Sequence, residues 1–221
     1  MNRTLFTRVI LFLLLPLFLT FCQTKEKISP REYPRVYTEA VTDINNSGAT
    51  FTGTIKTLGT APITDHGFVW SDKPYVFVDY SSRASLGAKQ ASGDTFNTTA
   101  TFAMQAGKTH YVRAYVRSGE YVVYGPLVSF ISNGSLPPVL NSFSPATARI
   151  NEYVTITGQN FTQDLTRLKV LFGSTAATVI SATPDTLVCM VPYNLQTTQV
   201  KITVQVVDKS VASASDFTLI K

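Results

Sequence analysis

The sequence has little charge, little cysteine and very little histidine or tryptophan. Only 15% of its 221 residues are charged, whereas typical soluble domains carry roughly 25%. It contains 2 cysteines, 2 histidines and 1 tryptophan. These shortages exclude a charged disordered tail, a disulfide framework and a zinc site built from paired cysteines. The net charge of +5 is not gathered into a basic cluster, so nucleic-acid binding is not expected.

Hydroxyl and β-forming residues fill the place of the missing charges. The chain has 30 threonines and 18 serines, and 88 of its residues are Val, Ile, Thr, Tyr, Phe or Trp. These last six types suit the half-buried surface of a pleated sheet. No window after the first 21 residues keeps a helical period of apolar residues. The sequence therefore predicts an all-β fold.

The first 21 residues have the pattern of a signal peptide. Arg3 and Arg8 supply a positive start, and residues 9–21 form an apolar stretch of 13 residues. A membrane-spanning helix needs about 20 apolar residues, so this stretch is too short to be a typical one. Its removal takes away two arginines and lowers the formal charge to +3, which gives no reason to expect an acidic partner.

The end of the apolar stretch, Leu19-Thr20-Phe21-Cys22, resembles a bacterial lipobox. In that motif a leucine stands three residues before a cysteine that becomes acylated, although Phe21 replaces the usual small residue. The resemblance implies a lipid on Cys22 as the contact with the membrane, and an outer-membrane location facing the surface or the periplasm. Residues 22–35 would then form a polar tether. The alternatives are an ordinary signal peptide and an uncleaved anchor.

The rest of the chain divides at residues 132–137, which are rich in turn-forming residues. Residues 36–131 and 138–221 both show short apolar runs separated by Gly, Asn, Asp and Pro. This spacing is typical of β-sandwiches, and each segment has a size that suits one small sandwich.

The first segment contains HGFVWS at residues 66–71, GKTHYVRAY at 107–115 and YGP at 124–126. These motifs resemble a fibronectin type III-like module of the kind found in bacterial surface lipoproteins. His110 stands where that family has a tyrosine at the corner of the sandwich. We therefore expect His110 to be a residue at the edge of the core, with a ring nitrogen hydrogen-bonded to backbone.

The second segment contains SP at residues 144–145, VTITGQNF at 154–161 and VLFG at 170–173. These elements, in this order, resemble an IPT/TIG domain, an immunoglobulin-like module. Asn151, Gly158 and Asn160 are residue types that tolerate a positive φ, as tight turns require. The two resemblances together imply two tandem immunoglobulin-like β-sandwiches after the signal peptide.

Neither segment offers a recognisable catalytic or metal-binding motif. There is no Gly-x-Ser-x-Gly elbow, and the acidic residues are scattered singly. Asp65 and His66 are neighbours on a predicted strand, so their side chains point to opposite faces. Cys189 lies in an apolar run and is expected to be a buried small hydrophobe. We predict a protein that is not an enzyme and has no cofactor or metal.

One strand offers a candidate binding face. Strand alternation places four side chains on one exposed face, and the opposite set, which starts with His110, faces the core. The four are Tyr111, Arg113, Tyr115 and Arg117. Tyr and Arg are enriched at recognition hot spots, and flat aromatic rings stack on sugars. The alternative is that these side chains only cover the sheet and pair across strands.

These features predict a non-enzymatic cell-envelope lipoprotein that acts as a binding or spacer module at the surface. Its partner would be a polysaccharide or a surface protein, in a glycan-binding or adhesive role. The alternative is a structural scaffold subunit of an envelope complex, which works through protein contacts and has no small ligand.

Overall fold

A computed structural model describes residues 32–89 and 93–220. Within these ranges the chain forms strands and turns but no helix, and so the predicted all-β class is confirmed. The same ranges contain no helix with the length and hydropathy needed to cross a membrane. The predicted signal peptide (residues 1–21), Cys22 and the tether up to residue 31 lie outside the described residues.

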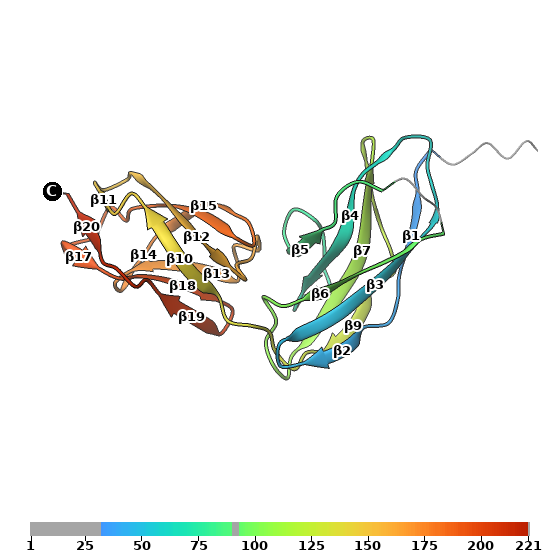
Figure 1. Cartoon of the computed structure of the whole chain (residues 1–221), viewed down its shortest axis with the longest axis horizontal. Coiled ribbons are helices and arrows are strands. Elements are labelled where there is room, and N and C mark those ends of the chain that lie inside the picture. The colour runs from blue at the N-terminus through green and yellow to red at the C-terminus, as the bar shows by residue number, and fades with distance from the viewer. Residues whose placement is uncertain (1–31, 90–92, 221) are drawn as a thin grey trace, which may run out of the picture.

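The strands between Arg35 and Ile131 pair only with one another and form an N-terminal sandwich of two sheets. The first sheet contains β1 (Arg35–Thr38), β3 (Gly48–Thr57), β2 (Thr42–Asn45) and β6 (Thr95–Ala100). The second contains β5 (Ser82–Ser85), β4 (Ile63–Ser71), β7 (Thr109–Ser118), β8 (Tyr121–Tyr124) and β9 (Val128–Ile131). Strands β4 and β7 are the longest pair in this second sheet and run through its centre (Figure 1).

The strands between Val139 and Leu219 form a separate C-terminal sandwich. One sheet contains β10 (Val139–Ser144), β12 (Tyr153–Gln159), β16 (Thr186–Met190) and β15 (Thr178–Ala182). A second contains β14 (Thr175–Ala176), β13 (Leu168–Phe172), β18 (Ile202–Val206) and β19 (Lys209–Ala212). A small third sheet joins β11 (Thr147–Ala148), β20 (Phe217–Leu219) and β17 (Gln199–Val200) at the outer end (Figure 1).

Aromatic side chains fill the cores of both sandwiches. In the N-terminal sandwich the buried ring of Phe51 contacts Phe68, Trp70 and Phe130, with centroids 5.5–5.8 Å apart. In the C-terminal sandwich the rings of Phe172 and Phe217 meet edge to face at 4.9 Å. Edge-to-face contacts of this kind add about 0.5–1.5 kcal/mol to the energy of apolar burial.

The expected turn residues mostly behave as predicted. Asn151 and Asn160 adopt positive φ values of 66° and 60°, which confirms the prediction for both asparagines. Gly158 is different, because it is absent from the residues with positive φ. A Cβ at this position would lie 1.9 Å from the carbonyl oxygen of Val139. The glycine is therefore required by close strand packing and not by a left-handed turn.

The segment between the two sandwiches is held against the N-terminal one. The Ser135 hydroxyl donates to the Met104 carbonyl at 3.0 Å and accepts from the Met104 amide at 3.2 Å. The Leu136 amide donates to the carbonyl of Thr101 at 2.7 Å. Because these bonds fix residues 135 and 136, the second half of the linker is ordered by its own side-chain and backbone contacts.

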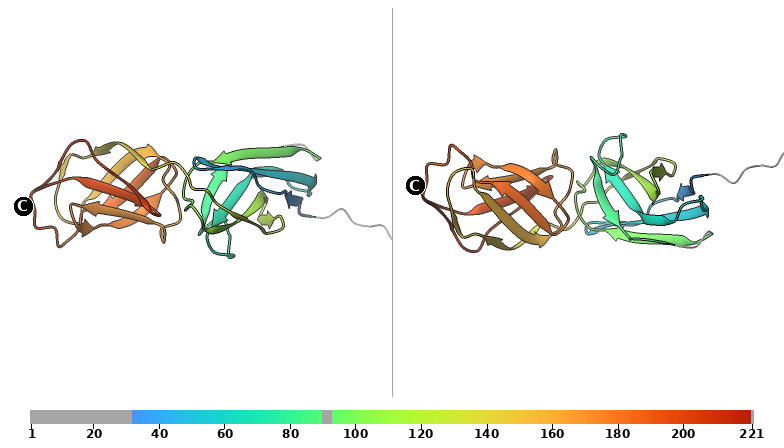
Figure 2. Two further views of the ribbon diagram at one scale, coloured as in Figure 1. Left: turned by 90° about the horizontal axis from the view of Figure 1, so that it is seen from below. Right: turned by 90° about the horizontal axis from the view of Figure 1, so that it is seen from above.

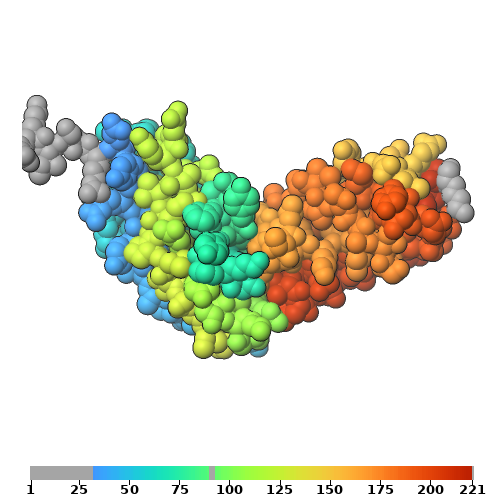
Figure 3. Space-filling model, turned by 180° about the vertical axis from the view of Figure 1, so that it is seen from behind, coloured from blue at the N-terminus to red at the C-terminus, as the bar shows by residue number. Residues whose placement is uncertain are grey.

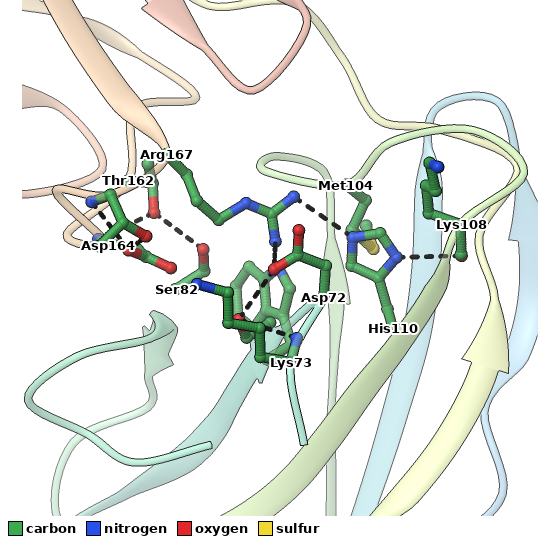
Figure 4. Close-up of polar contacts among 12 residues, drawn as sticks. Asp72, Lys73, Ser82, Met104, Lys108, His110, Thr162, Asp164 and Arg167 are labelled. Carbon is green, nitrogen blue, oxygen red and sulfur yellow. Dashed lines mark hydrogen bonds and ion pairs between the residues drawn. The ribbon is translucent and has the colours of Figure 1, made fainter. Parts of the chain in front are cut away.

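The two sandwiches lie end to end (Figure 2) and meet at an angle, so that the molecule is bent (Figure 3). Several polar contacts cross the joint, which is the region where the two sandwiches meet, and the close-up in Figure 4 shows most of the four named next. These contacts are Asp72–Arg167 at 3.4 Å, His110–Arg167 at 3.5 Å, Ser82–Thr162 at 2.8 Å and Thr101–Asn160 at 3.2 Å.

Candidate functional site

The strand proposed from the sequence as a binding face is β7, and its alternation is as predicted. Strand register pairs Tyr115 with Gly67 and Arg113 with Val69, so these residues share one face of the sheet. His110, Val112, Ala114 and Val116 are buried on the opposite face. The division of β7 into a core face and an outer face is confirmed.

The expected exposure of the outer face is wrong. Tyr115 has no exposed surface at all, and Tyr111, Arg113 and Arg117 are half-buried. The reason is the connection between β4 and β5, residues 72–81, which folds back over this face. Figure 2 shows this connection projecting from the sandwich before it returns to β5. We call residues 72–81 the aromatic loop.

Two valines of the aromatic loop pack against the sheet and hold the loop in place. Val76 and Val78 are buried and form a separate apolar cluster with Val69 and Tyr115. The Val78 amide also donates a hydrogen bond of 3.1 Å to the hydroxyl of Tyr124. The loop is therefore held by apolar packing and by a hydrogen bond from its backbone to the Tyr124 side chain, although it is not a β-strand.

Tyr115 lies beneath the aromatic loop in this cluster, and its hydroxyl has a hydrogen-bond partner there. Its hydroxyl donates to Oδ2 of Asp65 at 2.7 Å. Burial raises the pKa of the Tyr115 phenol well above its usual range, and the hydrogen bond to Asp65 raises it further. Tyr115 thus has a structural role beneath the loop and contributes no surface to a partner.

The alternation that buries the two valines turns the rings of Tyr75 and Phe77 outward, and Tyr80 is exposed in the turn that follows. Tyr75 and Tyr80 are 77% and 76% exposed, and Phe77 is 42% exposed. The Phe77 ring packs edge to face on Tyr124 with centroids 5.6 Å apart. The Ser81 hydroxyl accepts from the Phe77 amide at 3.1 Å, which closes the loop on itself. Exposed rings on a fastened loop form a ready-made contact surface.

The sequence contains a signal for this loop that the strand analysis missed. Residues 75–78 read Tyr-Val-Phe-Val, a strict alternation of aromatic and β-branched residues. An alternating pattern of this kind predicts that one side of the segment is buried and the other is exposed. Pro74 and Asp79 bound the pattern, and a run of this length does not by itself predict a strand.

Arginine side chains contact Tyr124 and the aromatic loop. The Nε of Arg113 donates to the carbonyl of Gly125 at 2.8 Å, and its guanidinium lies 4.9 Å from the centre of the Tyr124 ring. Burial lowers the pKa of Arg113. Arg117 forms an ion pair with the loop residue Asp79 at 3.7 Å. Arg83 lies on the same face, and its buried Nε has no hydrogen-bond partner among the described residues.

We give the name aromatic surface to the exposed rings of the loop, the half-buried Tyr124 ring that contacts Phe77, and the two arginines beside them. It consists of Tyr75, Phe77, Tyr80, Tyr124, Arg113 and Arg117. Aromatic rings and arginines lose little conformational entropy on binding and dominate recognition hot spots. The arrangement provides stacking faces and hydrogen-bond donors. In the described part of the chain no three His, Cys, Asp or Glu side chains are grouped so as to hold a metal.

The remaining residues singled out from the sequence have structural roles. Nδ1 of His110 lies 3.2 Å from the carbonyl of Lys108, so the predicted bond to backbone is confirmed. Asp65 bonds Tyr115 on the outer face whereas the His66 ring packs on Phe96 in the core, as strand alternation requires. Cys189 is buried as expected, and burial raises the pKa of its thiol to about 12.

The cavities of the molecule lie away from the exposed rings. A cavity of about 450 Å³ at the outer end of the C-terminal sandwich is lined mainly by aliphatic side chains, including Leu195 and Leu219. A smaller, polar one of about 220 Å³ lies at the joint and is lined by Asp72, Arg167 and Lys169, among others. Neither cavity is lined by a residue of the aromatic surface.

Comparison with known families identifies the second sandwich. Residues 138–219 match the model of the IPT/TIG domain. This sandwich is an IPT/TIG domain. The match confirms the resemblance seen in the sequence, and the domain begins one residue before β10. The Asn160 turn and the Arg167 side chain at the joint both belong to the IPT/TIG domain.

Comparison with solved structures gives weaker similarities. A protein of unknown function from Bacteroides thetaiotaomicron aligns at 30% identity over 38% of this chain and 22% of its own, with a TM-score of 0.37. A protein from a complex xyloglucan utilization locus in Bacteroides uniformis aligns at 16% identity over 84% of this chain and 49% of its own, with a TM-score of 0.36. A surface glycan-binding protein from Prevotella bryantii aligns at 13% identity, 85% and 43% coverage, and a TM-score of 0.40.

The chain thus spans less than half the length of each of these proteins. TM-scores of this size do not establish a shared overall architecture. No curated protein matches the chain.

Proposed function

We propose that this chain is a non-enzymatic cell-envelope lipoprotein that binds polysaccharide through the aromatic surface. The observation that carries the proposal is the outward exposure of Tyr75 and Tyr80 on a loop that Val76 and Val78 fasten to the sheet. A soluble domain gains nothing in stability from holding such rings in water, because apolar area in contact with solvent is unfavourable. Binding of a partner would explain why the rings are exposed and why the valines hold the loop in place.

Polysaccharide suits this surface better than a small ligand does. Sugar rings present flat faces of C–H groups that stack on aromatic rings, and their hydroxyls accept hydrogen bonds from guanidinium groups. The exposed rings line neither of the two cavities described above, and a long chain can stack on exposed rings without a pocket. Of the four residues first proposed, Arg113, Arg117 and the half-buried Tyr111 remain candidates for contact, whereas Tyr115 supports them from below.

The other parts of the chain have supporting roles in this proposal. The N-terminal sandwich is a fibronectin type III-like module that carries the aromatic loop, and the IPT/TIG domain lies beyond it. A lipid on Cys22 attaches the protein to the outer membrane. More than one acyl chain gives stable anchoring, because each buried CH₂ contributes about 0.8 kcal/mol. Mass spectrometry of the mature N-terminus should then show an acylated Cys22.

The test is a binding screen with the purified protein. It should be depleted from solution by at least one insoluble polysaccharide, or bind to at least one component of a glycan array, and an excess of the same soluble glycan should compete. A protein that ignores every polysaccharide but co-purifies with an envelope complex would replace this proposal with the scaffold alternative. Steady hydrolysis of a bound glycan by the same sample would contradict the non-enzymatic assignment.

A further inference from the structure

The chain contacts the IPT/TIG domain at both ends of the aromatic loop. Asp72 is the first loop residue after β4, and Ser82 is the residue with which β5 begins. Asp72 forms an ion pair with Arg167 at 3.4 Å, and Ser82 shares a hydrogen bond of 2.8 Å with Thr162. Figure 4 shows the Arg167 and Thr162 side chains reaching from the IPT/TIG side toward these two positions.

Three of the four side chains in these two contacts are shielded from water, and Asp72 is the exposed one. Ser82 and Thr162 are completely buried, and the Arg167 side chain is only 6% exposed, whereas the Asp72 side chain is 39% exposed. Exposed ion pairs contribute about 0–1 kcal/mol, whereas removing one partner from a buried pair is much more damaging. Loss of Asp72 would leave the buried Arg167 guanidinium without its carboxylate partner, so the position of Arg167 depends on Asp72.

The segment of the IPT/TIG domain that makes these contacts is itself braced. The Thr162 hydroxyl accepts from the amide of Asp164 at 3.1 Å. Oδ1 of Asp164 accepts from the amide and the hydroxyl of Thr166, at 3.0 and 2.6 Å. The amide of Arg167 donates to the carbonyl of Asp164 at 3.0 Å. Residues 162–167 thus form a compact turn that presents Thr162 and Arg167 together.

His110 holds the Arg167 guanidinium from the side of the N-terminal sandwich. Its Nδ1 faces the carbonyl of Lys108 at 3.2 Å and must carry the proton, since a carbonyl only accepts. Its Nε2 is then free to accept from Nη2 of Arg167, which lies 3.5 Å away. A neutral His110 and the carboxylate of Asp72 together fix where the guanidinium lies.

We infer that the IPT/TIG domain holds the aromatic loop in its binding geometry, with Arg167 and Thr162 as positioning residues that do not touch the ligand. This inference rests on the proposed function of the loop. A polymer that stacks on several rings at once is bound tightly only when the rings keep their spacing, because ordering a mobile loop reduces affinity. In this chain the IPT/TIG domain is therefore a part of the binding unit and more than a spacer.

Hydrogen exchange of the full chain tests the positioning role without any ligand. In Arg167→Met and Thr162→Val, amides of the aromatic loop such as those of Phe77 and Val78 should exchange about tenfold faster, while the central strands β7 and β18 keep their protection. Thr162→Ser keeps the hydroxyl and should restore wild-type exchange. Lys169→Met removes another cation from the cavity at the joint, and should leave the loop unchanged.

Affinity for a polysaccharide that the wild-type protein binds gives the second measurement. Arg167→Met should weaken binding about fivefold to tenfold, and its effect should largely disappear when Asp72→Asn is already present. Loop exchange that stays at the wild-type rate in both Arg167→Met and Thr162→Val would overturn the positioning role. An equal loss of affinity in Lys169→Met would also overturn it. A wild-type protein that binds no polysaccharide would overturn the proposed function, while the exchange rates still decide whether the domain fixes the loop.

Discussion

The hydroxyl oxygens of Ser82 and Thr162 lie 2.8 Å apart, and neither residue has any surface exposed to water. Ser82 begins the strand that follows the aromatic loop, and Thr162 belongs to the IPT/TIG domain, 80 residues further along the chain. One hydrogen bond thus connects the residue that directly follows the aromatic loop to the second sandwich.

Removal of one hydroxyl from this pair should destabilise the protein. Ser82→Ala leaves the Thr162 hydroxyl buried with a missing partner, which should lower the free energy of unfolding by about 1–2 kcal/mol. The double variant Ser82→Ala, Thr162→Val removes both hydroxyls and should lose less than the sum of the two single variants. Urea denaturation of the four proteins measures this coupling. Additive losses would show that the two hydroxyls do not act as a pair.

The valine beneath the loop should matter for stability as well as for binding. Val78→Ala removes two buried methyl groups from the cluster with Tyr115 and should lower the free energy of unfolding by about 2 kcal/mol. Val139→Ala is the control, because Val139 is 38% exposed and its loss should have an effect of about 0.5 kcal/mol or less. Equal effects of the two variants in urea denaturation would show that the loop is not fastened at Val78.

Tyr115 should behave as a buried structural tyrosine. Tyr115→Phe removes the hydrogen bond to Asp65 and should lower the free energy of unfolding by about 2 kcal/mol at neutral pH. The pKa of this phenol is raised in the folded state, so its contribution is present below about pH 10 and is lost as the pH rises further. The wild-type protein should therefore lose more stability above pH 10 than Tyr115→Phe does.

The control for this alkaline measurement is Tyr193→Phe, which changes a tyrosine that is 77% exposed on the IPT/TIG domain. It should follow the wild-type curve of unfolding free energy against pH. If Tyr115→Phe followed that curve too, the phenol of Tyr115 would not be protected by burial and by Asp65.

Acid should weaken the joint through His110. Burial lowers the pKa of its imidazole, and the charge of Arg167 lowers it further against the raising effects of the Lys108 carbonyl and Asp72. A pKa lowered on folding means that the contribution of neutral His110 is full above about pH 6.5 and is lost as the pH falls through the folded value. A protonated ring would also lose the acceptor that faces Arg167.

His110→Gln tests this acid sensitivity, because an amide can donate to the Lys108 carbonyl and accept from Arg167 without titrating in this range. Thermal unfolding from pH 7 to pH 4 should show a smaller fall in Tm for His110→Gln than for the wild-type protein. Equal falls would assign the acid sensitivity to the carboxylates and not to His110.

Features of the fold that depend on local pattern could be predicted from the sequence. Alternation along β7 assigned His110 to the core and Tyr115 to the opposite face, and the apolar run around Cys189 indicated its burial. Asn151 and Asn160 could be placed in turns because few other residues adopt a positive φ at low energetic cost.

The burial of the outer face of β7 under the aromatic loop could not be predicted in the same way. Alternation tells which side chains point outward, but not whether a later segment packs on them, and Tyr115 is buried by residues more than 30 positions earlier in the chain. The pairing of Asp72 with Arg167 has no local signature either, since it depends on how two sandwiches meet. The candidate site therefore moved from the strand to the loop that covers it.

The most direct measurement is polysaccharide affinity in a matched pair of tyrosine variants of the full chain. Tyr75→Ala, Tyr80→Ala removes the two most exposed rings of the aromatic loop, whereas Tyr153→Ala, Tyr193→Ala removes rings that are 58% and 77% exposed on the IPT/TIG domain. The loop variant should bind the selected polysaccharide at least about tenfold more weakly, a loss of about 1.4 kcal/mol, with an unchanged Tm. The IPT/TIG variant should bind as the wild-type protein does. Wild-type affinity in the loop variant, or an equal loss in both variants, would contradict the assignment of the binding surface to the aromatic loop.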